Sequence, residues 1–143
     1  MEKLDRHQND EGGIFQYGKG LSGNKTLVRG WGEPEKGFVW SEGKAAALSL
    51  PSRARAKLIS ATVWGYASEG TPVQDVLVFM NGTFKGFFEI SDKTTIDIAL
   101  GSAETSNPID LLFYLPNAIS PRKAEGLPDD RRIAIALVSL RMS

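Results

Sequence analysis

The sequence predicts an all-β protein, folded as a two-sheet antiparallel β-sandwich of the jelly-roll type. Short apolar runs recur along the chain and are separated by glycine, proline, asparagine and serine residues. Several of these runs alternate apolar and polar residues, which is typical of half-buried strands. No long segment has the 3.6-residue periodicity of an amphipathic helix.

The 143 residues fit one domain with a two-layer core. Residues 1–12 are polar and lack apolar periodicity, so they are expected to form a flexible N-terminal arm. Residues 13–143 are expected to form a single sandwich of roughly eight strands, which suits a jelly roll. Two long loops are expected, at residues 18–43 and 117–130.

The clearest element is a β-hairpin around Asn81-Gly82. This pair favours a type I′ turn, because both central residues of that turn need a positive φ. The two-residue loop is expected to set two pairs opposite each other, Phe79 with Phe84 and Val76 with Phe87. Since both of its faces carry apolar groups, the hairpin is expected inside a sheet and not at its edge.

The other strands are expected at KAAALSL (44–50), AKLISATVWGYA (56–67), TTIDIAL (94–100), IDLLFYL (109–115) and RIAIALVSLRM (132–142). Alternation places three sets of side chains toward the core: Ile96, Ile98 and Leu100; Ile109, Leu111, Phe113 and Leu115; Ile133, Ile135 and Leu137. The alternation fails at Val138, which indicates a bulge or a strand covered on both faces.

Composition excludes most catalytic chemistry. The chain has no cysteine, and its one histidine is His7, in the predicted arm. A folded site therefore cannot contain a Ser-His-Asp or Cys-His arrangement, and it cannot contain a histidine-based metal site. We expect no enzyme activity, no cofactor and no metal ligands. The remaining catalytic option is a carboxylate pair that cleaves glycosides, drawn from Glu33, Glu35, Glu42, Asp129 and Asp130. Capping or salt-bridging roles are favoured for these acids.

The charge balance bears on the partners. Seventeen Lys and Arg residues balance seventeen Asp and Glu residues, which argues against nucleic-acid binding. Local basic runs, at Arg53, Arg55 and Lys57 and at Arg131-Arg132, are expected to be solvated strand ends and loops. No stretch reaches the ~20 apolar residues of a membrane helix, so no membrane insertion is expected.

The N-terminal residues lack the apolar core of a secretory signal. The protein is therefore expected in the cytoplasm as written, or outside it if the chain is a piece of a longer membrane protein. The sequence does not indicate the oligomeric state.

Residues 30–40 (GWGEPEKGFVW) combine two tryptophans with two acids. Indole faces can stack on sugar rings while carboxylates accept hydrogen bonds from sugar hydroxyls, which would make a glycan site. Alternatively, Trp31 and Trp40 close the end of the sandwich and their indole N–H groups donate to loop carbonyls. The residue types alone favour this structural alternative.

Several short motifs occur in a particular order: Gly30-Trp31, Pro34-Glu35, Trp40-Ser41, Gly43, Asn81-Gly82, Ser120-Pro121, Asp130 and Arg132. This order resembles a bacterial β-sandwich accessory domain that is appended to surface-polysaccharide and glycosyltransferase-type membrane proteins. The resemblance implies a carbohydrate-binding-like module with a glycan partner. The ligand-binding residues that we expect from it are Trp31, Glu35, Trp40 and Arg132.

Three functions follow, in order of preference. The first is a non-catalytic glycan-binding module of bacterial surface-polysaccharide metabolism. The second is a structural or protein-interaction module in which the same residues only hold the loops together. The third is a glycan-active enzyme that uses carboxylates alone. We also expect Glu35 and Arg132 to form a partly buried ion pair beside Trp31.

Overall fold

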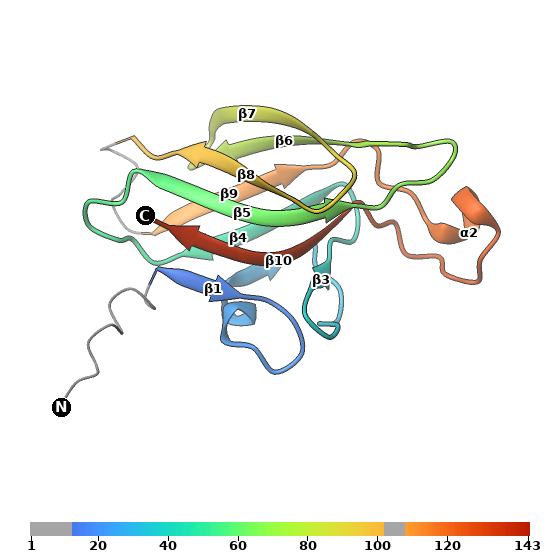
Figure 1. The fold of residues 1–143 in the computed structure, drawn as a ribbon, viewed down its shortest axis with the longest axis horizontal. Coiled ribbons are helices and arrows are strands. Elements are labelled where there is room, and N and C mark those ends of the chain that lie inside the picture. The colour runs from blue at the N-terminus through green and yellow to red at the C-terminus, as the bar shows by residue number, and fades with distance from the viewer. Residues whose placement is uncertain (1–12, 102–107) are drawn as a thin grey trace.

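The computed structural model describes residues 13–101 and 108–143, which form two antiparallel β-sheets packed face to face (Figure 1). Sheet A contains, in spatial order, β1 (Ile14–Gln16), β10 (Ile135–Met142), β5 (Leu58–Gly65) and β8 (Thr94–Ala99), with β3 (Val39–Trp40) also paired to β10. Sheet B contains β2 (Leu27–Arg29), β4 (Ala45–Leu50), β9 (Ile109–Tyr114), β6 (Gln74–Met80) and β7 (Thr83–Ile90). The predicted β-sandwich is confirmed.

The chain passes repeatedly from one sheet to the other, and Figure 1 shows β10 and β5 in front of β4 and β9. Alternate side chains of both sheets point into the space between them, where water is excluded. The core positions predicted from the alternation are buried, as are those of β4, β5 and β6: Ala46, Leu48, Leu50, Ile59, Ala61, Val63, Val76, Val78 and Met80. A register shift lies between Leu137 and Ser139, which confirms the bulge predicted at Val138.

The Asn-Gly hairpin is confirmed, but its register was only half right. Asn81 and Gly82 have φ values of 49° and 85°, as a type I′ turn requires. Phe79 does pair with Phe84, whereas Val76 pairs with Phe88 and not with Phe87. A register shift between Val78 and Phe79 causes this difference, since it inserts one extra residue into β7.

The predicted position of the hairpin was also partly wrong. β6 lies inside sheet B, but β7 is an edge strand. Phe84 and Phe87 are about half exposed there. Apolar side chains on both faces of a strand therefore did not indicate a central strand in this case.

The two predicted loops contain more structure than expected. Residues 18–43 include a 3₁₀ turn (Ser22–Thr26) and the short strands β2 and β3. Residues 117–130 include helix α2 (Pro121–Glu125), which begins after the capping Ser120 and ends at Gly126, whose φ is 73°. These additions give ten strands in the described part of the chain, against the roughly eight that were expected. No helix among the described residues is long and apolar enough to cross a membrane. The predicted arm, residues 1–12, lies outside the described residues.

Candidate functional site

The outer face of sheet A carries an ordered set of side chains. Directly paired residues of an antiparallel sheet point to the same side, so the register aligns them in rows across the strands. The rows are Ile14–Arg141–Ser60–Asp97, Gln16–Ser139–Thr62–Thr95 and Trp40–Ala136–Trp64. Along β5 the outward residues alternate with buried core residues. The sheet therefore presents polar side chains over two rows and aromatic side chains at the third.

Four aromatic rings cluster at the third row. The ring centroids of Trp40 lie 5.8 Å from Phe38, 5.8 Å from Trp64 and 6.1 Å from Tyr66. Phe38 and Trp64 are 4.7 Å apart. All of these pairs meet edge to face, an arrangement that stabilises aromatic pairs beyond the burial of their area. We call this group, Phe38, Trp40, Trp64 and Tyr66, the aromatic cluster.

A small residue makes the cluster possible. Ala136 lies between Trp40 and Trp64 in the register and is completely buried although it is on the outer face. Its methyl group leaves space for the two indoles to meet over β10. Each ring of the cluster stays partly exposed, so aromatic surface remains accessible to a ligand.

An open hollow of about 420 Å³ adjoins the cluster. Its lining combines three rings with polar and charged groups: Trp40, Trp64, Gly65, Tyr66, Ala67, Ser91, Asp92 and Lys93. A second hollow, of about 610 Å³, lies over the two polar rows. Within these rows Ser60 Oγ donates to Asp97 Oδ1 at 2.7 Å, and the hydroxyls of Thr62 and Thr95 are 3.2 Å apart. β5 lines both hollows, the second through Thr62 and the first through Trp64, which is two residues further on the same face.

Helix α2 fixes one ring of the cluster. The Tyr66 hydroxyl donates a hydrogen bond to Glu125 Oε2, at the end of α2. Desolvation of the phenol, and next the hydrogen bond to Glu125, raise the pKa of Tyr66 to about 12. The tyrosine therefore stays protonated at neutral pH and can hold the Glu125 carboxylate.

Buried Ser41 ties β3 to β10. Its Oγ accepts hydrogen bonds from the backbone N–H groups of Ala134 and Ile135, at 3.2 and 3.0 Å. The Ser41 N–H donates in turn to the Ile135 carbonyl at 2.8 Å. Trp40 directly precedes Ser41, so these bonds determine where its indole lies on sheet A.

An arginine reinforces the same junction. Arg131 forms a bidentate pair with Asp129, with Nη2–Oδ2 at 2.8 Å and Nε–Oδ1 at 3.0 Å, and its Nη1 lies 3.7 Å from Glu42 Oε2. Hydrogen bonds from the Arg131 side chain and backbone lower the pKa of Asp129 to about 2. The Asp129 hydrogen bond correspondingly raises the pKa of Arg131. This network joins the segment after α2 to the loop that carries β3.

The structure separates the residues that the sequence suggested for the site. Trp40 belongs to the aromatic cluster on sheet A. Trp31 packs instead toward sheet B, where its Nε1 donates to the Ala47 carbonyl at 2.9 Å and its ring meets Phe113 edge to face at 6.4 Å. Glu35 lies in the turn that leads to Phe38, and its backbone N–H donates to the Phe38 carbonyl.

Arg132 is exposed, and its carbonyl accepts from the Gly43 N–H at 2.7 Å. The predicted ion pair between Glu35 and Arg132 was wrong, since both are described residues and no ion pair joins them. The neighbouring Arg131 forms ion pairs with Asp129 and Glu42 instead.

Sequence reasoning missed three members of the cluster, Phe38, Trp64 and Tyr66. A usable signal was present in the segment predicted as a strand at 56–67. Ser60, Thr62, Trp64 and Tyr66 recur every second residue, opposite in phase to the core residues of β5. The position of Phe38 depends on a turn with Gly37 at a φ of 89°, and that turn has no strand periodicity.

Among the described residues, no group of three or more His, Cys, Asp or Glu side chains could hold a metal ion. No family model matches the sequence, and no curated protein matches it.

Solved structures do match, at low sequence identity. One is a family two carbohydrate esterase from Clostridium thermocellum in complex with cellohexaose, with a TM-score of 0.53 and 11% identity over 92% of this chain. This chain spans only 31% of that esterase. Another is the CBM36-1 domain of a multidomain xylanase from the hindgut metagenome of Trinervitermes trinervoides, with a TM-score of 0.49 and 11% identity. The match covers 91% of this chain and 94% of that domain.

A family 6 carbohydrate-binding module is also similar, with a TM-score of 0.46 and 14% identity, over 91% of this chain and 92% of its own. The structural neighbours of this chain thus include carbohydrate-binding modules. At 11% identity, the match with a TM-score above 0.5, that to part of the esterase, shows a shared fold alone.

Proposed function

We propose that this protein is a non-catalytic glycan-binding module whose binding surface is the outer face of sheet A. The observation that carries this proposal is the aromatic cluster, which lies beside a hollow and at the end of two polar rows. A sugar ring offers an apolar C–H face and a rim of hydroxyl groups. The cluster and the rows offer the matching surfaces side by side.

The polar rows suit an extended oligosaccharide. Hydroxyls of Ser60, Thr62, Thr95 and Ser139 line the hollow over these rows, and each can both donate and accept a hydrogen bond. Ser60 lies four residues before Trp64 on β5, which corresponds to about 13 Å along a strand. A ligand held by both ends of this surface would therefore be a chain of sugars and not a single ring.

Acidic side chains also line this surface. Asp97 lies on β8, and Asp92 lies in the turn before that strand. Asp97 Oδ1 accepts a hydrogen bond from Ser60 Oγ at 2.7 Å, so this carboxylate is already engaged with its neighbour on the sheet. Its place in the polar row supports a role in binding. The sequence resemblance supports the finer proposal that the glycan is a bacterial surface polysaccharide.

A glycan screen that is read by tryptophan fluorescence tests the proposal. We expect Trp64→Ala to weaken binding of any glycan found by about tenfold or more, because it removes a stacking face. Trp31→Phe is the matched control, since Trp31 packs toward sheet B. It should lower stability and leave the affinity unchanged. The proposal fails if folded Trp64→Ala binds as the parent does and Trp31→Phe does not.

A second candidate function, protein interaction, is favoured by the outer face of sheet B. Two apolar rows cross it, Ala45–Tyr114–Leu77–Phe87 and Ala47–Leu112–Phe79–Phe84. Phe84, Phe87 and Tyr114 are 53%, 51% and 42% exposed. Contiguous exposed apolar surface of this kind often marks an interface. Sedimentation of the parent and of a Phe84→Ser, Phe87→Ser double variant tests this role, and identical behaviour would count against self-association.

A further inference from the structure

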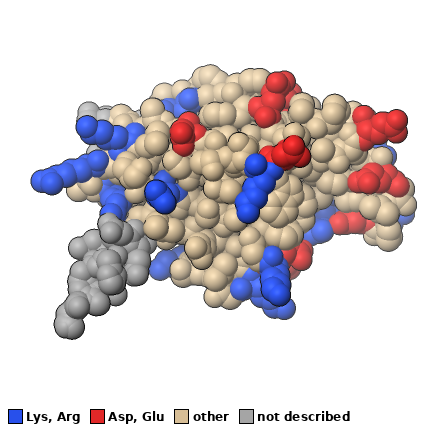
Figure 2. Space-filling model, viewed as in Figure 1, with Lys and Arg blue, Asp and Glu red and all other residues tan. Residues whose placement is uncertain are grey.

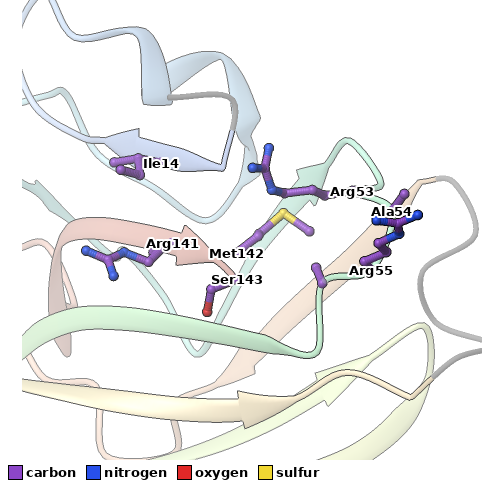
Figure 3. A pocket seen from close by; sticks show the side chains of 8 residues that line it. Ile14, Arg53, Ala54, Arg55, Arg141, Met142 and Ser143 are labelled. Carbon is purple, nitrogen blue, oxygen red and sulfur yellow. The ribbon is translucent and has the colours of Figure 1, made fainter. Parts of the chain in front are cut away.

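A basic pocket of about 510 Å³ lies at the end of sheet A away from the aromatic cluster. Arg53 and Arg55 reach it from the loop after β4, and Arg141 reaches it from β10 (Figure 3). Met142 lies between Arg141 and that loop, and its side chain is buried. The pocket is thus lined by three arginines with an apolar side chain between them, and Figure 3 shows the Arg141 guanidinium pointing away from those of Arg53 and Arg55.

No ion pair joins any of the three arginines to a carboxylate within residues 13–101 and 108–143. Ser143 also lines the pocket, and its carbonyl oxygen accepts from the backbone N–H groups of Lys57 and Leu58. Figure 2 shows Lys and Arg side chains at the end of the molecule where β10 finishes, and Asp and Glu side chains at the opposite end. A protein of zero net charge therefore has a locally positive end.

The loop holds Arg55 in an unfavourable conformation. The Ala56 N–H donates to the Arg53 carbonyl at 3.2 Å and closes a tight turn, in which Arg55 has a φ of 67°. Glycine or asparagine normally occupies such a position, because a Cβ makes the left-handed region costly. Strain of this kind occurs often where a side chain has a function that the backbone must accommodate.

We propose that this pocket binds the anionic substituent of an acidic glycan, a carboxylate, sulfate or phosphate group, whose sugar chain extends along the outer face of sheet A. This inference rests on the proposed function. The pocket and the hollow over the polar rows share Ile14, Arg141 and Ser143, so one ligand can occupy both. Guanidinium groups recognise carboxylate and phosphate oxygens through paired N–H donors.

The geometry favours a glycan over a nucleic acid. Three arginines line this one pocket, whereas a nucleic-acid surface needs a basic stripe that follows many phosphates. The rows that lead away from the pocket carry hydroxyl groups and Asp97, and further basic side chains are not among them. From the sequence alone, Arg53 and Arg55 were expected to be solvated loop residues. The sequence does not reveal that Arg141 lines the same pocket.

The test compares a trigalacturonate with the same trisaccharide after its carboxylates are reduced to alcohols. Binding is followed by NMR of the arginine Nε–Hε groups and by tryptophan fluorescence, with a sugar phosphate as a third ligand. We expect the acidic trisaccharide to bind at least about tenfold more tightly than the reduced one and to shift the Arg53, Arg55 and Arg141 signals. A shift by the sugar phosphate alone would assign the pocket to phosphate-bearing glycans.

Two variants isolate the pocket. Arg141→Gln should reduce the preference for the acidic ligand about tenfold. Arg55→Gly should do the same while leaving the fold at least as stable, because glycine suits the positive φ. Arg132→Gln removes one exposed positive charge outside the pocket and should leave the preference within twofold.

The outcomes separate the two proposals. The acidic-glycan inference is overturned if both trisaccharides bind equally, if Arg132→Gln matches the pocket variants, or if a DNA duplex shifts the arginine signals more strongly than either acidic sugar does. A Trp64→Ala effect on the reduced trisaccharide would still leave the glycan-binding proposal standing. If the arginines select the acidic ligand but Trp64→Ala changes no affinity, the anion pocket stands and the aromatic surface is not the glycan site.

Discussion

Replacing Ser41 with alanine should destabilise the protein strongly, although the change removes only one hydroxyl group. The Ser41 side chain is completely buried, and its Oγ accepts from two backbone N–H groups, those of Ala134 and Ile135. Alanine keeps the Cβ and removes only this acceptor. Both donors would then remain in the interior, where water does not replace the lost partner.

The expected size follows from these two donors. A buried polar group that loses its partner costs about 1–3 kcal/mol of stability. Since the two N–H groups share one acceptor, we expect a loss of about 2–4 kcal/mol in the free energy of unfolding. For a chain of this length that corresponds to a fall in Tm on the order of 10 °C.

Urea unfolding and thermal melts measure the effect. Ser60→Ala is the matched control, because Ser60 donates to Asp97 on the exposed surface of sheet A. It should change stability by no more than about 0.5 kcal/mol. If Ser41→Ala unfolds at the same urea concentration as the parent, with the same slope, the two hydrogen bonds do not anchor β3 and the reasoning is refuted.

Three further predictions concern other parts of the structure. Ala136→Leu should lower stability by about 1–3 kcal/mol and change the near-UV circular dichroism, because its larger side chain pushes into the two indoles; an unchanged spectrum would contradict this. The Asp129 carboxyl should titrate by NMR at about 2, and Arg131→Met should return its pKa toward 3.8. The folded state lowers this pKa, so the ionised Asp129 carboxylate stabilises the fold at pH values above its ordinary pKa. That stabilisation is lost as the pH falls toward 2. Burial raises the pKa of Tyr17 to about 12. The protonated Tyr17 phenol therefore contributes to the stability of the fold below pH 10, and this contribution is lost as the pH rises through 12. Absorbance of the phenolate follows this titration, and a Tyr17 pKa near 10 would contradict it.

Local periodicity explains why most strands could be predicted. In β9, Ile109, Leu111 and Phe113 recur at every second position and are buried, whereas the intervening Asp110, Leu112 and Tyr114 lie on the less buried face. The hairpin turn depends on two adjacent residues and was likewise predictable. Its register failed beyond Val78, because a β-bulge arises from the fit of two whole strands and has no reliable local signature.

The candidate site was predicted less well, because its side chains meet through the pairing of strands that are distant in sequence. Trp31 and Trp40 are near in sequence, and residue types alone suggested one common site. Trp31 forms a bridge with Ser41, the residue after Trp40, and packs toward the opposite sheet. Besides Phe38, the ring partners of Trp40 are Trp64 and Tyr66, which lie more than twenty residues further along the chain.

The amino-acid sequence by itself determined the all-β class and most strand positions, because these follow from residue type and spacing. Only the tertiary structure decided which side chains meet. The aromatic cluster joins β3, β5 and the turn before β3, and the basic pocket joins Arg141 on β10 to the loop after β4. Both depend on strand order and register, which arise from burying two whole sheets against each other and which no short stretch of sequence specifies.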